Sequence, residues 1–102
     1  MKTKFNSLEE VKEYLIEKKK VCLQATRDSF GFFTNYKDFK NRAEEYKEIF
    51  LKNYFAFLLC YDLEKEEMEK IKADFLEAYK ELLNKAENKY IEIAREIINY
   101  VL

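Results

Sequence analysis

The chain has 102 residues, a formal net charge of −1 at pH 7, 48% hydrophobic residues and 38% charged residues. This length suits a single domain, so we expect residues 1–102 to form one. The hydrophobic share argues against a disordered chain, and the balanced charge argues against a nucleic-acid binder that depends on net charge alone.

The first predicted element is a helix that begins after Ser7 and ends near residue 28. Ser7 is followed three residues later by Glu10, the spacing of a capping box, in which each side chain accepts a hydrogen bond from an unpaired backbone amide. We expect the helix to pack through one apolar stripe, formed at helical spacing by Leu8, Val11, Leu15, Cys22 and Ala25.

Residues 30–35 form the next feature, a break between two helices. Gly31, the only glycine in the chain, tolerates a positive φ, and Thr34 or Asn35 can cap the helix that follows. We therefore expect a second helix to begin near Tyr36.

The second helix contains an uninterrupted apolar octet, Tyr54–Tyr61. A helix that is apolar on every side has to be buried in protein or lipid, and an octet is too short to cross a bilayer, which needs about 20 residues. We therefore expect the octet to be the core of the fold and expect no membrane partner. A second apolar stripe, Leu51, Phe55 and Leu59, is covered either by residues 1–8 of the same chain or by a partner.

The third predicted helix spans residues 63–101. Asp62 can cap it, and apolar residues keep helical phase to its end. Asn84 and Asn88 each cost about half a kcal/mol relative to Ala, too little to end a helix, although a break at residues 84–89, giving four helices, is the alternative. The expected fold class is thus all-α, an antiparallel three-helix bundle with a long third helix.

Because the third helix is the longest, its end at residues 94–102 should extend beyond the turn at residues 31–33. This overhang is apolar and needs a cover, which is either the aromatic loop acting as a lid or a second copy of the protein. If the loop is not a lid, it is a partner-binding tip. The candidate partner-binding residues are therefore Leu51, Phe55, Leu59, Phe30, Phe32, Phe33, Ile97 and Leu102.

The two cysteines, Cys22 and Cys60, form no CxxC pair, and both lie in apolar stretches. We expect both to be buried, reduced thiols, separated by about 27 Å along the bundle and so unable to form a disulfide. No apolar signal segment follows Met1. These features are typical of a cytoplasmic protein.

Basic residues are in excess at one end of the predicted bundle, where aromatic residues lie among them. This arrangement can hold phosphate groups and stack bases, which makes nucleic-acid binding the alternative function. Basic residues that stabilise the ends of helices give the same pattern. The candidate nucleic-acid-binding residues are Lys18, Lys19, Lys20, Arg27, Lys37, Lys40 and Arg42.

The sequence offers little for catalysis or for a cofactor. It has no His, which removes the usual general base and a common zinc ligand, and with one Gly it cannot form a glycine-rich phosphate loop. We therefore expect no catalytic residue, no cofactor and no metal.

One partial motif remains. The segment 44–48 reads EEYKE and resembles the first half of the EExxE and ExxD motif of the all-helical MazG-type NTP pyrophosphatases. The resemblance implies carboxylates on facing helices that hold magnesium against a triphosphate. The second half departs from the motif, because only Glu64-x-x-Glu67 and Asp74-x-x-Glu77 follow.

The absence of catalytic motifs and the surplus of apolar surface together favour one function. We expect a non-catalytic protein-binding module or inhibitor that acts through apolar helix surface and self-associates as a homodimer. Its other partner is a protein whose identity the sequence does not encode.

Overall fold

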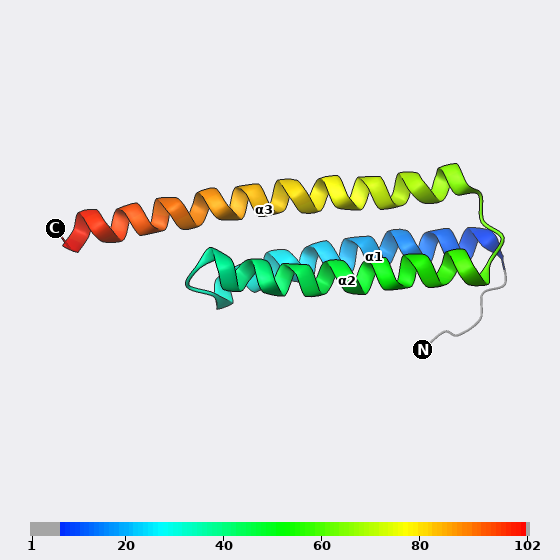
Figure 1. Ribbon diagram of the computed structural model, residues 1–102, viewed down its shortest axis with the longest axis horizontal. Coiled ribbons are helices and arrows are strands. Elements are labelled where there is room, and N and C mark those ends of the chain that lie inside the picture. The colour runs from blue at the N-terminus through cyan, green and yellow to red at the C-terminus, as the bar shows by residue number, and fades with distance from the viewer. Residues whose placement is uncertain (1–6, 102) are drawn as a thin grey trace.

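The computed structural model describes residues 7–101 (Figure 1). They form α1 (Leu8–Ser29), the short 3-10 helix η1 (Phe30–Phe32), α2 (Tyr36–Cys60) and α3 (Lys65–Val101). α1 and α2 are antiparallel neighbours, and α3 runs along both, which confirms the all-α antiparallel three-helix bundle with a long third helix. α3 is one helix of 37 residues without a break at residues 84–89. The result is a rod with extents of 62 × 27 × 16 Å.

Polar side chains fix the starts of α1 and α2 as the sequence predicts. Ser7 Oγ accepts a hydrogen bond from the backbone amide of Glu10 at 3.2 Å. Asn35 Oδ1 accepts one from the backbone amide of Asp38 at 2.9 Å. Each bond pairs one of the amides that a helix start leaves without a helical partner.

α3 begins two residues later than predicted. Tyr61 is extended, with φ −131° and ψ 147°, and the Glu64 carbonyl accepts a bond from the Met68 amide at 3.1 Å. The expectation that Asp62 caps a helix from residue 63 is therefore wrong. Residues 61–64 form the connection that carries the chain from α2 across to α3.

The turn at Gly31 is correctly placed, but the predicted reason for it is wrong. Among residues 7–101 no residue has a positive φ, so Gly31 does not adopt the left-handed conformation. The chain instead tightens into η1 and then leaves it at Phe33, which is extended at φ −124° and ψ 142°. A Cβ on Gly31 would meet nothing within 4 Å.

The core lies along the inner faces of the three helices as two clusters. In the larger, Phe50 of α2 stacks on Phe75 of α3, with ring centroids 4.1 Å apart and planes 22° from parallel. The smaller cluster, at the η1 end, consists of Phe39, Ala86 and Tyr90.

The apolar octet is not the core, which corrects the sequence-based expectation. Of its residues only Tyr54 is buried, at 1% exposure, while Leu59 is 88% exposed. The octet forms the last turns of α2, which α1 and α3 can contact from one side only. The outer side of an all-apolar helix therefore stays at the surface of a three-helix bundle.

The two cysteines differ in exposure. Both are free thiols, as expected, and Cys22 is buried between the helices. Cys60 is exposed, so the expectation that it is buried is wrong. It is the last residue of α2, where the helix gives way to the connection to α3.

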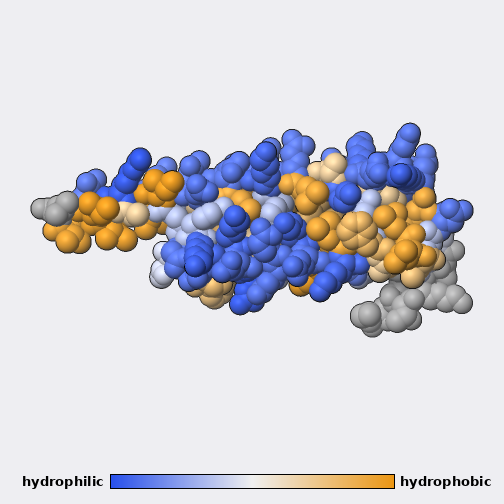
Figure 2. Space-filling view, in the orientation of Figure 1, coloured by the Kyte–Doolittle hydropathy of each residue, from blue (hydrophilic) through white to orange (hydrophobic). Residues whose placement is uncertain are grey.

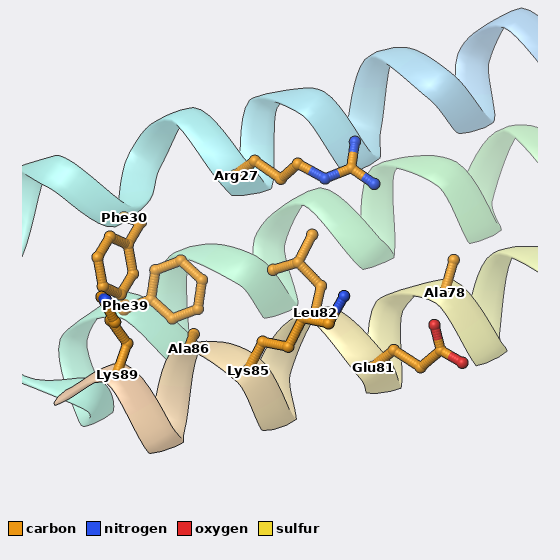
Figure 3. Close-up of a pocket in the computed structure, with 9 residues that line it drawn as sticks. All are labelled: Arg27, Phe30, Phe39, Ala78, Glu81, Leu82, Lys85, Ala86 and Lys89. Atoms are coloured by element: carbon orange, nitrogen blue, oxygen red, sulfur yellow. The ribbon is translucent and has the colours of Figure 1, made fainter. Parts of the chain in front are cut away.

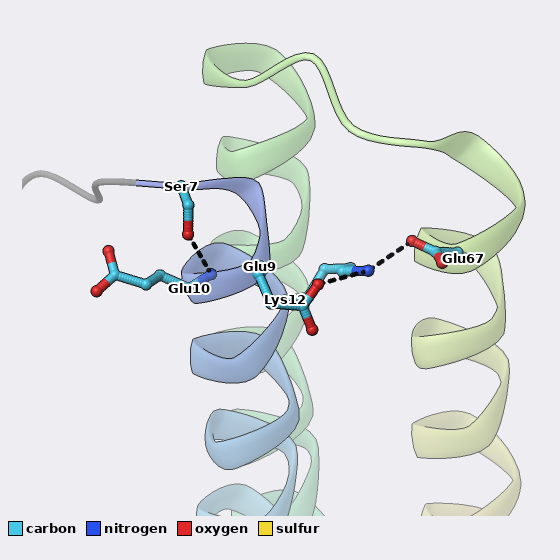
Figure 4. A network of polar contacts seen from close by, with 5 residues as sticks. All are labelled: Ser7, Glu9, Glu10, Lys12 and Glu67. Atoms are coloured by element: carbon cyan, nitrogen blue, oxygen red, sulfur yellow. Dashed lines mark hydrogen bonds and ion pairs between the residues drawn. The ribbon is translucent and has the colours of Figure 1, made fainter.

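One ion pair joins α1 to α3 near the start of both helices (Figure 4). Lys12 Nζ lies 2.9 Å from Glu67 Oε2 and 3.1 Å from Glu9 Oε2. The carboxylates of Glu67 and Glu9 raise the pKa of Lys12 above its ordinary value. Exposed ion pairs contribute little to stability, so the packing of the two helices depends on their apolar faces more than on this pair.

Candidate protein-binding surfaces

The C-terminal part of α3 projects beyond the other two helices (Figure 1). We call residues 91–101 the overhang. Its base is held at Tyr90, whose hydroxyl donates toward the backbone carbonyls of Phe30 at 3.1 Å and Phe33 at 3.0 Å. The Tyr90 ring also lies against that of Phe30, with centroids 4.7 Å apart. This anchor fixes where the supported part of α3 ends.

The overhang continues the buried face of α3 without cover. Ala86 and Tyr90 are buried, and the same spacing of three and four residues leads on to Ile93 and Ile97. Exposure rises along this path, because no second helix faces it. The exposed apolar side chains of the overhang are Ile91 at 42%, Ile93 at 37%, Ile97 at 58%, Ile98 at 54%, Tyr100 at 93% and Val101 at 77%.

Figure 2 shows hydrophobic surface along the edge of the overhang that continues toward the α1–α2 side. Hydrophilic residues cover most of the opposite edge of α3. The overhang is therefore amphipathic, with its apolar side turned to where further helices would lie.

A groove of about 530 Å³ opens at the base of the overhang. One wall is the segment Thr34–Tyr36 at the start of α2, and the other is α3. Glu87 is the only charged residue in its lining. The α3 wall consists of Glu87, Tyr90, Ile91, Ile93, Ala94 and Ile97.

A second apolar surface lies at the opposite end of the rod. We call Phe55, Leu58 and Leu59 the α2-end patch; they are 50%, 36% and 88% exposed. Lys72 of α3 lies over the Phe55 ring, with Nζ 5.8 Å from its centroid. Leu51, the other member of the predicted stripe, packs against the larger core cluster. Whether residues 1–8 cover the patch, as one alternative predicted, stays open, because residues 1–6 lie outside the described residues. The candidate partner-binding residue Leu102 also lies outside them.

The aromatic loop divides its three phenylalanines between inside and outside. Phe30 and Phe33 pack against the smaller core cluster. Phe32 is 82% exposed and is not among the residues packed against that cluster. The loop therefore closes the end of the α1–α2 pair but leaves Ile97 and the rest of the overhang uncovered.

The basic residues predicted to bind nucleic acid do not form one group. Arg42 Nη1 pairs with Glu45 at 3.5 Å, and its guanidinium lies 6.0 Å from the Phe33 ring centroid. Arg27 instead lines a groove together with Lys85 and Lys89 of α3, which lie 58 and 62 positions later in the sequence and so share no local pattern with it. The remaining candidates lie along α1 (Lys18, Lys19, Lys20) and in the first turns of α2 (Lys37, Lys40).

Arg27, Lys85 and Lys89 line a groove of about 380 Å³ between α1 and α3 (Figure 3). Figure 3 shows Phe30, Phe39 and Ala86 together at one end of the groove, with Leu82 beside them. Glu81 supplies a negative charge to the same lining. The groove is apolar in its floor and mixed in charge at its rim.

In the MazG-like segment Glu45 and Glu48 are exposed on α2, whereas Glu44 is part-buried and lies near the Tyr79 hydroxyl of α3. Glu44 Oε2 pairs with Lys47 Nζ at 2.6 Å, and this partner lowers the pKa of Glu44. Within residues 7–101, no three Cys, Asp or Glu side chains gather closely enough to hold a metal ion.

Comparison with known protein families, with curated proteins and with solved structures found no match to the chain. Along residues 7–101, no helix combines the length and the apolar character needed to cross a membrane. The two exposed apolar surfaces, the overhang and the α2-end patch, are therefore the features from which a function can be argued.

Proposed function

We propose that the protein is a cytoplasmic, non-catalytic protein-binding module or inhibitor that acts through exposed apolar helix surface and self-associates. The observation that carries the proposal is the exposure of large apolar side chains at both ends of the rod, above all Leu59 at 88% and Tyr100 at 93%. Scattered single exposures of this kind are ordinary, but grouped ones are typical of interaction surfaces.

The α2-end patch is the surface for a foreign partner in this proposal. Its three side chains occupy consecutive turns of one rigid helix, so their positions are set before binding and little side-chain freedom is lost. Lys72 beside Phe55 adds one positive charge at the edge. An apolar centre with a charged rim is the usual construction of a protein–protein interface.

The test is site-specific capture followed by reconstitution. A photo-crosslinking residue at Leu59 should capture a protein from the native cell that the same group at Leu76, 37% exposed on α3, does not capture. With the captured protein purified, Leu59→Ala should raise Kd about 10- to 80-fold, since burial of this side chain is worth about 1.3–2.6 kcal/mol after scaling by its exposed fraction. Leu76→Ala is the matched control and should leave Kd within about 2-fold.

Two results would contradict the proposal. One is equal capture at Leu59 and Leu76. The other is a complex whose affinity falls steeply with added salt and with Arg27→Ala, because an apolar interface responds weakly to salt while phosphate contacts respond strongly. The second result would support the nucleic-acid alternative.

A further inference from the structure

We infer that two copies of the protein pair their overhangs antiparallel about a two-fold axis, each tip seated in the other copy's groove at Thr34–Tyr36. The inference rests on the proposed self-association and says where and how it occurs. It assigns the overhang to a second copy of this chain and leaves the α2-end patch to the foreign partner.

The first argument concerns the kind of surface that can cover the overhang. The uncovered face is the continuation of the face that packs on α1 and α2, from Ala86 through Tyr90 to Ile93 and Ile97. An occupant that covers it needs an apolar side about 16 Å long, the length of residues 91–101 at 1.5 Å per residue, and a helix that packs alongside, as α1 and α2 do, meets this need. The overhang of a second copy has this length and this apolar side.

The second argument selects the antiparallel orientation. In a parallel pair the two α3 helices would face each other through the side on which α1 and α2 lie. Both copies would then place α1 and α2 in the same space. In an antiparallel pair the second bundle extends in the opposite direction, so only the overhangs overlap.

The third argument concerns the groove. When residues 91–101 overlap antiparallel, Val101 of one copy lies level with Ile91 of the other, at the groove formed by Thr34–Tyr36 and α3. The walls that meet the incoming tip are mostly apolar, with Glu87 as the charged residue in the groove lining. The match between tip and groove is therefore one of apolar surface, not of charge.

The fourth argument is the area. A fully exposed aliphatic side chain offers about 60–120 Å² of apolar surface and an aromatic one about 150–250 Å². Scaled by the exposed fractions along the overhang, each copy supplies on the order of 400 Å², and the pair buries on the order of 1,000 Å² with the groove walls. This is the lower end of specific interfaces, so we expect a reversible dimer with a Kd in the micromolar range.

The experiment compares two substitutions of one residue type by sedimentation equilibrium of the full chain. Ile97→Glu places a carboxylate twice in the symmetric seam and should raise the dimer Kd by about 100-fold or more. Ile49→Glu, at a residue of α2 that is 43% exposed, should leave Kd within about 3-fold. Far-UV circular dichroism checks that both variants remain helical.

Disulfide trapping tests the geometry independently. In a Cys22→Ser, Cys60→Ser background, chains carrying Tyr100→Cys are mixed with chains carrying Asn35→Cys and oxidised. The mixed disulfide should form far faster than one between Tyr100→Cys and Asp62→Cys, which lies at the other end of the rod.

Each contrary outcome identifies what has failed. A dimer that survives Ile97→Glu, or that traps Asp62→Cys as fast as Asn35→Cys, overturns the inference and leaves self-association standing. A monomer at all concentrations, with capture at Leu59 intact, overturns the inference and the self-association but not the binding function. Loss of both signals removes the proposed function itself.

Discussion

The hydroxyl of Tyr90 is a single group that holds the aromatic loop against the base of the overhang. It donates toward two backbone carbonyls, of Phe30 and Phe33, that lie about 60 residues away in the sequence. Tyr90→Phe keeps the ring, which packs against Phe30 and Phe39, and removes only this donor. The substitution therefore isolates the polar part of the anchor.

The expected cost of Tyr90→Phe is about 1–2 kcal/mol in the free energy of unfolding. A net hydrogen bond contributes about 0.5–1.5 kcal/mol, and the two part-buried carbonyls lose a donor at the same time. For a chain of this size, that cost corresponds to a fall in Tm of about 4–16 °C. Amide hydrogen exchange in residues 30–35 should also accelerate, because the loop opens before the helices do.

Tyr79 supplies the matched comparison. Its hydroxyl is buried and forms no well-aligned hydrogen bond with the described residues, but the Glu44 carboxylate lies near it and, together with burial, raises the pKa of Tyr79. Tyr79→Phe removes a buried hydroxyl that has the Glu44 carboxylate near it but no well-aligned hydrogen bond, so its cost should be smaller than that of Tyr90→Phe, about 0.5 kcal/mol or less. The same urea titration, followed by far-UV circular dichroism at one protein concentration, measures both variants. Equal costs for the two substitutions, or a larger cost for Tyr79→Phe, would refute the reasoning.

Two further predictions concern pH and thiol chemistry. Burial raises the pKa of Tyr79, Tyr54 and Tyr90 above the ordinary value of 10.0, so the unfolded chain loses these protons at a lower pH than the folded chain does. The stabilisation from these neutral tyrosines should therefore be complete below that pH, and the free energy of unfolding should fall as the pH rises above it. Tyr79→Phe should make this fall less steep. A free energy of unfolding that stays constant from pH about 9 to about 11 would contradict this. Cys60 is exposed, whereas Cys22 is buried and its burial raises the pKa of its thiol. A thiol reagent should therefore modify Cys60 at once and Cys22 only when the protein unfolds. Prompt labelling of a Cys60→Ser variant would contradict the burial of Cys22.

The helices could be predicted from sequence because their signals are local. Ser7 and Asn35 cap the first two helices through contacts within one turn, and apolar spacing carries α3 through Asn84 and Asn88. The overhang followed from helix lengths alone.

The burial of the octet Tyr54–Tyr61 could not be predicted from its hydrophobicity, because hydrophobicity does not show how many other helices pack around a segment. An all-apolar segment indicates burial only where other elements surround it, and two helices cover one side of α2. Tyr90 was overlooked as an anchor for a related reason: its phenol fits the apolar stripe, while its acceptors are backbone carbonyls of a distant loop. The grouping of Arg27 with Lys85 likewise depends on tertiary structure.

The continuity of α3 has a consequence for how the protein can engage others. A helix of 37 residues without a break is stiff, so it keeps the overhang and the α2-end patch at opposite ends of a rod 62 Å long. In the dimer that we propose, two rods joined over about 16 Å of overhang would make a strut on the order of 110 Å long, with one α2-end patch at each tip. Such a strut would be bivalent: it would bridge two partner molecules that never touch, and on a surface carrying many copies of the partner its avidity would exceed the affinity of either end.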